Sequence, residues 1–194
     1  MPSEIVLQVL RHLWATLKPL DIPLALVGGI ALATWKYIRA TKDVDVLMGI
    51  GEADLPDVLE RLLAANVRFK QDPPVVDVGA LAIVQLQYEP PETFVDVQID
   101  LLLARSPYHF QSLDRRVPTR LPGLDVEIDV LACEDLILHK LEVGRLIDRA
   151  DAAALLRANR HALDVDYLRQ WADELKITEE LSEVWGEAFP GESP

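Results

Sequence analysis

Two adjacent glycines, Gly28 and Gly29, and two aspartates one residue apart, Asp43 and Asp45, are the residues best placed to do chemistry. The glycines follow a short apolar run, residues 24–27, which has the length of a buried strand. Glycines at a strand end let a ligand approach the backbone, and a helix that begins there offers unpaired N–H groups to an anion. Asp43 and Asp45 alternate with apolar residues, so both carboxylates point to one face of a strand. An anion site beside two hard oxygen ligands suits a triphosphate with its magnesium ions.

A third carboxylate is available on a later strand. Residues 94–103 alternate between an apolar face and a polar face that carries Asp96, Gln98 and Asp100. If this strand neighbours the one with Asp43 and Asp45, one of its acids joins the pair. Carboxylates about 4 Å apart repel by roughly 4 kcal/mol per pair at an intermediate dielectric. Such a cluster is reasonable only if cations bind it.

Chance alone can also produce an aspartate pair with the spacing of Asp43 and Asp45. Roughly one or two Asp-x-Asp pairs are expected by chance in a chain this rich in aspartate. Asp164 and Asp166 are interpreted as such a pair, at the start of a helix where acids favour the dipole. Spacing alone leaves both interpretations of Asp43 and Asp45 open, and only the preceding double glycine sets this pair apart.

The predicted elements place these residues in an alternating fold. Apolar residues at helical spacing predict helices over residues 5–17 and 54–66, and Pro107 starts another short one. Strands are predicted at residues 24–27, 43–48, 82–88 and 94–103, with a hairpin over residues 117–130. From residue 134 onward the pattern is helical. The predicted fold class is α/β (α+β), with a small mixed sheet flanked by helices and a helical C-terminal part.

Composition narrows the function classes. The 194-residue chain has a net charge of −13 and a pI of about 4.6, which disfavours broad, sequence-independent nucleic-acid binding. The clustered bases are few, namely Arg115, Arg116 and Arg120. The absence of a signal-peptide pattern and of a long apolar run, with a single cysteine, predicts a cytoplasmic protein without a membrane partner.

Other reactive residue types lack a supporting context. The four histidines are scattered and are assigned to the surface or to packing; they are His12, His109, His139 and His161. No serine has a hydrolase motif around it, and the glycine pair lacks the Gly-Lys-Ser/Thr ending of a P-loop.

The glycine and aspartate pattern resembles the signature of the DNA polymerase β-like nucleotidyltransferase superfamily. More closely, Arg39-x-Thr41-x-Asp43-x-Asp45 is similar to the form found in AbiE-type toxin nucleotidyltransferases and related uncharacterised bacterial families. A later block resembles the same families, and consists of Glu134, Asp135, Lys140, Arg145, Asp148 and Asp151. The resemblance covers roughly residues 24–156. Two departures are that Cys133 stands where a small hydroxyl cap is expected, and that the chain is short for such a toxin.

The resemblance implies roles for individual residues. Gly28 and Gly29 would hold the nucleotide phosphates, and Asp43 and Asp45 would bind two Mg²⁺ ions. Asp100, which fits the third-acid strand better than Asp96, would bind the ion that activates the acceptor. Further nucleotide contacts would come from Arg39, Thr41, Lys42 and Lys140. The roles of Arg145, Asp148 and Asp151 stay open, because helical spacing alone lets them form i,i+3 ion pairs.

The resemblance also implies a domain plan and an activity. Residues 1–130 would be the catalytic domain, residues 131–189 a helical C-terminal subdomain, and residues 190–194 a flexible tail. The activity would be transfer of a nucleoside monophosphate from an NTP to a hydroxyl acceptor, with release of pyrophosphate. The acceptor would be a small molecule, a tRNA end or a protein side chain, and an antitoxin partner is possible. The alternatives are a catalytically silent binding module of a toxin–antitoxin pair and an enzyme that modifies aminoglycoside-like compounds.

Overall fold

The computed structural model describes residues 2–51, 53–72, 74–78, 81–192 and 194. The chain divides into two compact units. The sheet unit consists of Met1–Ala31 and Arg39–Leu131, and the helical unit consists of Leu32–Ile38 and Ala132–Pro194. The division after residue 131 lies where the composition changes to helix-forming residues. Residues 32–38, by contrast, lie inside the predicted catalytic domain and belong to the helical unit.

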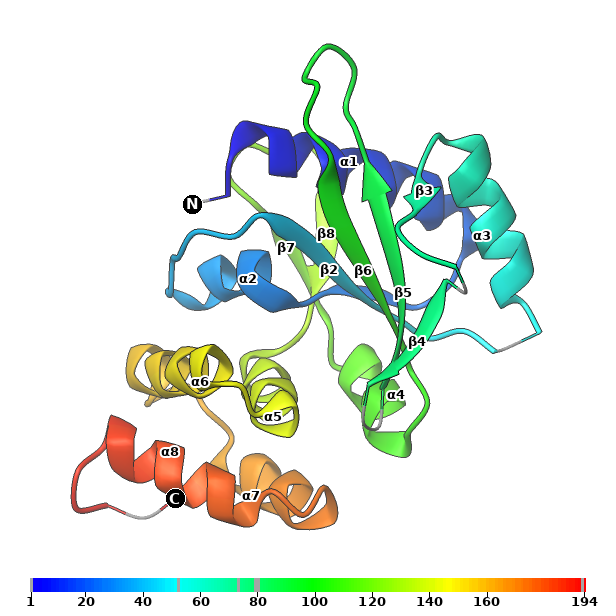
Figure 1. The fold of residues 1–194 in the computed structure, drawn as a ribbon. Coiled ribbons are helices and arrows are strands. Elements are labelled where there is room, and N and C mark those ends of the chain that lie inside the picture. Colours follow the sequence, from blue (N-terminus) through cyan, green and yellow to red (C-terminus); the bar gives the residue numbers. More distant parts are fainter. Residues whose placement is uncertain (1, 52, 73, 79–80, 193) are drawn as a thin grey trace. The chain divides into compact units, whose positions relative to one another are not determined.

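A mixed sheet forms the centre of the sheet unit (Figure 1). Its strands are β1 (Leu24–Leu26), β2 (Asp43–Met48), β3 (Arg68–Phe69), β4 (Val75–Val78), β5 (Leu81–Tyr88), β6 (Val97–Leu103), β7 (Val117–Arg120) and β8 (Glu127–Val130). Their order is β3-β5-β6-β2-β1-β8-β7, and β4 pairs with β5. β2 runs parallel to β6 and β1 parallel to β8, while the other paired strands are antiparallel. The sheet therefore joins β2 and β6, which are far apart in the sequence.

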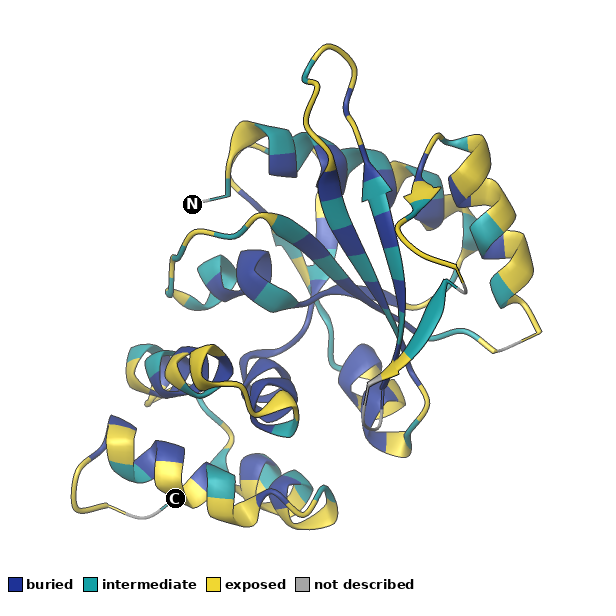
Figure 2. Ribbon diagram, in the orientation of Figure 1, coloured by how far each residue is buried: buried dark blue, intermediate teal, exposed yellow. Residues whose placement is uncertain are grey.

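The faces of the central strands differ in burial. Along β6, and along β2 from Asp43 to Val46, every second residue is buried, and the residues with no exposed surface include Val44, Val46, Ile99 and Leu101. The residues between them, including the aspartates, are half-buried, as the alternating colours of these strands show (Figure 2). Period-two alternation in the sequence thus becomes one apolar face and one polar face.

Four α-helices accompany the sheet among the described residues of its unit. They are α1 (Glu4–Leu17), followed by the 3-10 helix η1 (Lys18–Leu20), then α2 (Gly28–Ala31), α3 (Leu55–Ala64) and α4 (Pro107–Asp114). The hydroxyl of Ser3 caps α1 by accepting from the Val6 N–H at 3.4 Å, as the sequence predicts. The apolar stripe of α1 packs on β2, β6 and α3.

The helical unit is a small bundle. Its elements are the 3-10 helix η2 (Leu32–Trp35), α5 (Cys133–Val143), α6 (Leu146–Asn159), α7 (Val165–Glu174) and α8 (Thr178–Ala188). α6 packs on α5, α8 and η2, and α7 packs on α5 and α8. The mixed sheet and the helical C-terminal part confirm the predicted fold class. Among the helices of the described residues, none combines the length and the apolar character needed to cross a bilayer.

Candidate active site

The parallel pairing of β2 with β6 brings the three acids together. Asp45 lies directly opposite Asp100 in the register, and Asp43 lies opposite Gln98. Paired residues on neighbouring strands, about 4.8 Å apart, point to the same face. All three carboxylates therefore lie on the half-buried polar face, in the arrangement that the sequence predicts.

Gly28 lies against the carboxylate of Asp45. Its φ is +62°, and a Cβ at this position would come within 1.8 Å of the Asp45 Oδ2 and 2.5 Å of its Cγ. The preceding residue is tied to the same strand, because the Val27 N–H donates to the Asp45 carbonyl at 2.9 Å. The backbone of the glycine turn therefore borders the acids, and only glycine fits at this position.

Gly29 is packed under the loop that leads to the acids. A Cβ at Gly29 would lie 2.6 Å from the Thr41 Oγ1 and 3.4 Å from the Arg39 Nη1. The Thr41 hydroxyl in turn donates to the Asp43 Oδ1 at 2.5 Å. Gly29 therefore packs against Thr41, which in turn is hydrogen-bonded to Asp43.

The helix that follows the glycines is short. α2 spans only Gly28–Ala31 before the chain continues as the 3-10 helix η2. A single turn carries little macrodipole, so phosphate binding here would depend on the approach of backbone N–H groups. The apolar residues after the glycines likewise favour only a short helix.

The two cations of the motif loop differ in exposure. The half-buried Arg39 donates from Nη1 to the Ala40 carbonyl at 3.0 Å, which folds its guanidinium back onto the loop. Lys42 is exposed. Both cations flank Thr41, next to the strand that carries Asp43 and Asp45.

Asp100 has a perturbed environment. Burial raises its pKa; hydrogen bonds from Gln98 and Gln85 and the charge of Lys70 oppose this, while repulsion by Asp43 adds to it, and the net pKa is raised. The Gln98 Nε2 donates to both oxygens of Asp100, each at 2.9 Å. An acid with a raised pKa on a half-buried polar face is characteristic of functional sites.

Asp96, the rejected third acid, has a different setting. It precedes β6, is exposed, and forms an ion pair with Arg68. Asp100 is therefore the acid of this stretch that lies opposite Asp45.

Lys140 lies in a buried charge cluster of the helical unit. Its Nζ is 2.7 Å from the Asp148 Oδ1 and 3.0 Å from the Asp151 Oδ2. Arg145 forms the i,i+3 ion pair with Asp148 at 2.5 Å that helical spacing allows. Burial alone would raise the pKa of Asp148, but hydrogen bonds from Arg145 and Lys140, with their charges, lower it. These four residues form one ion-pair cluster that links α5 and α6. A contact of Lys140 with phosphate stays a prediction.

His12, His109 and Cys133 have roles in packing or in helix capping. His12 stacks on Tyr88 with 4.1 Å between ring centroids, and the ring of His109 completes the capping box of α4. Cys133 is the first residue of α5, after the N-cap Ala132, and burial beside Glu134 raises its pKa to about 12. A buried thiol of this kind is not a nucleophile.

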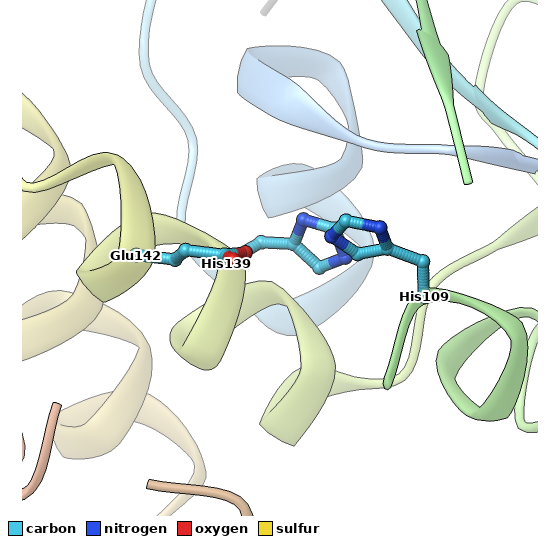
Figure 3. A group of neighbouring side chains, drawn as sticks. All are labelled: His109, His139 and Glu142. Atoms are coloured by element: carbon cyan, nitrogen blue, oxygen red, sulfur yellow. The ribbon is translucent and has the colours of Figure 1, made fainter. Parts of the chain in front are cut away.

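The spacing of His139 and Glu142 was not singled out from the sequence. His139 and Glu142 are three residues apart on α5, a spacing that places two metal-ligand types on one side of a helix (Figure 3). Two ligands alone do not make a metal site.

A family model matches almost the whole chain. The model, described as nucleotidyl transferase AbiEii toxin of a type IV toxin–antitoxin system, matches residues 8–191. Among curated proteins the comparison found no match.

Several solved structures share the fold at low identity. An antigenic nucleotidyltransferase-like protein from Paracoccidioides brasiliensis is 17% identical with a TM-score of 0.51, covering 96% of this chain and 97% of that one. A putative nucleotidyltransferase from Thermotoga maritima is 13% identical with a TM-score of 0.54, covering 90% and 96%. ANT(2″)-Ia in complex with adenylyl-2″-tobramycin is 15% identical with a TM-score of 0.56, covering 87% and 97%. At these identities the likeness is one of fold.

Proposed function

Because the chain belongs to the AbiEii family of nucleotidyl transferase toxins from type IV toxin–antitoxin systems, we propose that it transfers a nucleoside monophosphate from an NTP to a hydroxyl acceptor. Pyrophosphate is the other product. The observation that carries this proposal is the register that sets Asp45 opposite Asp100, with the Gly28 backbone against the Asp45 carboxylate. Gly28, Asp45 and Asp100 are also among the residues to which the resemblance assigns phosphate and metal binding.

The donor set fits divalent magnesium. Asp43, Asp45 and Asp100 supply carboxylate oxygens, the ligands that Mg²⁺ prefers. An ionised carboxylate offers about four lone-pair positions. Thr41 uses one on Asp43, and on Asp100 Gln98 uses two and Gln85 a further one. The proposed assignment is that Asp43 and Asp45 hold both ions and that Asp100 holds the acceptor-side ion. Bound Mg²⁺ ions supply charge neutralisation at the phosphates and a lower pKa for the acceptor hydroxyl.

The residues of the chain would contribute mainly by positioning. The Gly28 and Gly29 backbone would bind the phosphates, and Thr41 would fix the orientation of Asp43. Arg39 and Lys42 flank Thr41 and would add positive charge beside the triphosphate, with Lys140 as a further proposed contact. The acceptor oxygen bonds to the α-phosphorus, the bond to the leaving pyrophosphate breaks, and the hydroxyl proton is released. Positioning and electrostatics account for most of the acceleration in such transfers.

The first experiment follows label and pyrophosphate together. The purified protein is incubated with each α-labelled NTP, Mg²⁺ and a cell lysate as the source of acceptors. We expect release of pyrophosphate and a labelled product, and loss of both by at least about a thousandfold in Asp45→Asn. Asp96→Asn is the matched control, because Asp96 is exposed and paired with Arg68, and it should retain activity. Full turnover by a folded Asp45→Asn variant would overturn the proposal.

The acceptor is identified by fractionating the lysate. Separate reactions with purified tRNA, with protein and with a cationic aminoglycoside show which class takes up the label. The net charge of −13 favours a cationic small molecule, whereas toxin-family membership favours a cellular macromolecule. NTP binding without pyrophosphate release would support the alternative, a catalytically silent module of a toxin–antitoxin pair. Co-expression with a neighbouring antitoxin gene, if it restores growth, would support the proposed antitoxin partner.

A further inference from the structure

The polar face of the sheet continues past the three acids toward β3. Asp45, Asp100 and Gln85 lie opposite one another on β2, β6 and β5. The Lys70 N–H, just after β3, donates to the Gln85 carbonyl at 3.0 Å, so Lys70 continues the same row. Side chains of this row point to one face. A cation is thereby placed two strands away from the third acid.

A chain of hydrogen bonds runs from that cation to Asp100. The Lys70 Nζ donates to the Gln98 Oε1, and the Gln98 Nε2 donates to both Asp100 oxygens at 2.9 Å. Lysine has only donors, so it can meet only the carbonyl end of the amide. The NH₂ end of Gln98 must then face Asp100. Lys70 therefore fixes the orientation of the Gln98 side-chain amide.

The position of this amide restricts the carboxylate. A single nitrogen at equal distances from both oxygens lies between them, where it prevents the carboxylate from rotating and uses one lone-pair position on each oxygen. The remaining lone-pair positions are fixed in direction as a result. A carboxylate that is oriented before an ion binds does not have to be ordered at that moment, which favours binding.

We propose that Gln98, oriented by Lys70, is a positioning residue that holds Asp100 in the orientation needed for the acceptor-side ion. This inference rests on the proposed function, because it assigns Asp100 to a divalent ion. Gln85 adds a further hydrogen bond to Asp100 from β5. Gln87 provides a matched control, because it lies opposite Gln98 in the register, on the same half-buried face.

The first test measures Mn²⁺ binding to the nucleotide-free protein by electron paramagnetic resonance. The variants are Gln98→Met, Lys70→Met and Gln87→Met, which preserve side-chain length and remove the polar group. We expect the Mn²⁺ Kd to rise about fivefold in Gln98→Met, about the cost of ordering one side chain, and about two- to threefold in Lys70→Met. Gln87→Met should bind as the wild type does. Equal or tighter binding by a folded Gln98→Met variant would overturn the proposal, and thermal unfolding establishes that each variant is folded.

The second test separates this inference from the proposed function. In the transferase assay, Gln98→Met should lower kcat about tenfold or more and leave the NTP KM within about twofold, because the nucleotide contacts remain. If the wild type shows no turnover but Gln98→Met still binds Mn²⁺ more weakly than the wild type does, the proposed transferase function is refuted and the positioning role of Gln98 is retained. An active wild type matched by Gln98→Met in both kcat and Mn²⁺ affinity would refute the positioning role alone.

Discussion

The contact between Gly28 and Asp45 leaves no room for a side chain. The glycine has a left-handed backbone, and the Asp45 oxygen occupies the position that a Cβ would take. Close packing of the Gly28 backbone on Asp45 suits a phosphate-binding turn, because the backbone N–H groups can then reach an anion beside the acids. Here a single hydrogen atom in place of a methyl group decides whether the site can form.

The substitution Gly28→Ala should therefore damage both stability and activity. The strained backbone and the displaced Asp45 should cost about 1–3 kcal/mol of unfolding free energy. Turnover should fall at least about a hundredfold, because a displacement of about 1 Å misaligns the acids. Gly186→Ala is the control: nothing lies within 4 Å of a Cβ there, and this helical position should become slightly more stable. Urea unfolding and the pyrophosphate assay measure the two effects, and wild-type kinetics in Gly28→Ala would contradict this account.

Asp100 should make the metal-free protein less stable as the pH rises. Burial raises its folded-state pKa, so between the ordinary value and the raised one the folded protein holds a proton that the unfolded chain has lost. Stability from this group is complete below the ordinary pKa and is lost as pH increases through the raised pKa. Without divalent ions, Asp100→Asn should melt at a higher temperature than the wild type at neutral pH, and the two melting temperatures should converge in acid.

Adding Mg²⁺ supplies the control for that comparison. The ion should raise the melting temperature of the wild type more than that of Asp100→Asn, because the variant keeps Asp43 and Asp45 but has lost a ligand of the acceptor-side ion. A wild type that is more stable than Asp100→Asn at neutral pH without divalent ions would contradict a raised pKa for Asp100.

Among the residues of the site, those with a regular pattern were predictable. The alternation around Asp43, Asp45 and Asp100 indicates which face each carboxylate takes, and the parallel register confirms that placement. Gln98 and Lys70 were not predicted to act on Asp100. Nothing in the sequence reveals that residue 70 follows a strand in the same sheet, since this depends on the path of the chain.

At the scale of elements, long periodic segments were predicted and short ones were missed. The helix from residue 5 to 17 and the strand at residues 43–48 match α1 and β2 closely. β3 and β4, with two and four residues, carry too few side chains to show a period. β6 starts at Val97 rather than at residue 94, because Phe94 has a φ of +53° that a strand does not allow.

The charge cluster on α5 and α6 joins two helices through buried ions. Lys140 is 8% exposed and Asp148 1% exposed, so each has left water almost completely. Burying ions in this way is favourable only when all partners are present. The cluster therefore makes the packing of α5 on α6 depend on a single lysine.

Lys140→Met should destabilise the protein by about 3–5 kcal/mol, because it leaves Asp148 and Asp151 buried without their shared cation. The double variant Lys140→Met with Asp151→Asn should recover part of that loss. Arg145→Met is the control; this side chain is 69% exposed, and its removal should cost about 1 kcal/mol or less. Chemical denaturation followed by circular dichroism gives all three values, and a Lys140→Met loss no larger than that of Arg145→Met would contradict the role of burial.

At the scale of the whole molecule, charge limits the partners. The formal charge of −13 arises from 32 acidic and 19 basic residues. The basic cluster near residue 116 does not offset it, because Arg116 and Arg120 pair with Asp129 and Glu127. A nucleic acid acceptor would have to be recognised through a small local contact instead of a broad basic surface.

The protein should consequently show no general affinity for nucleic acid. In a gel-shift experiment at about 50 mM salt, random-sequence duplex DNA should migrate unchanged at micromolar protein concentrations. A basic nucleic-acid-binding protein of similar size is the positive control. Retardation that disappears with added salt would contradict this prediction, because it would indicate binding through a basic surface.

The segment Leu32–Ile38 makes the helical unit discontinuous in sequence. Within that unit, the Asn159 amide donates to the Trp35 carbonyl at 2.8 Å, so this insertion supplies an acceptor to α6. One proteolytic cut near residue 131 would not release two intact pieces, since the C-terminal fragment would lack η2 and the N-terminal fragment would keep it without its bundle. Anyone who transplants the helices onto another protein must also bring these residues, by circular permutation or by adding them as a separate peptide.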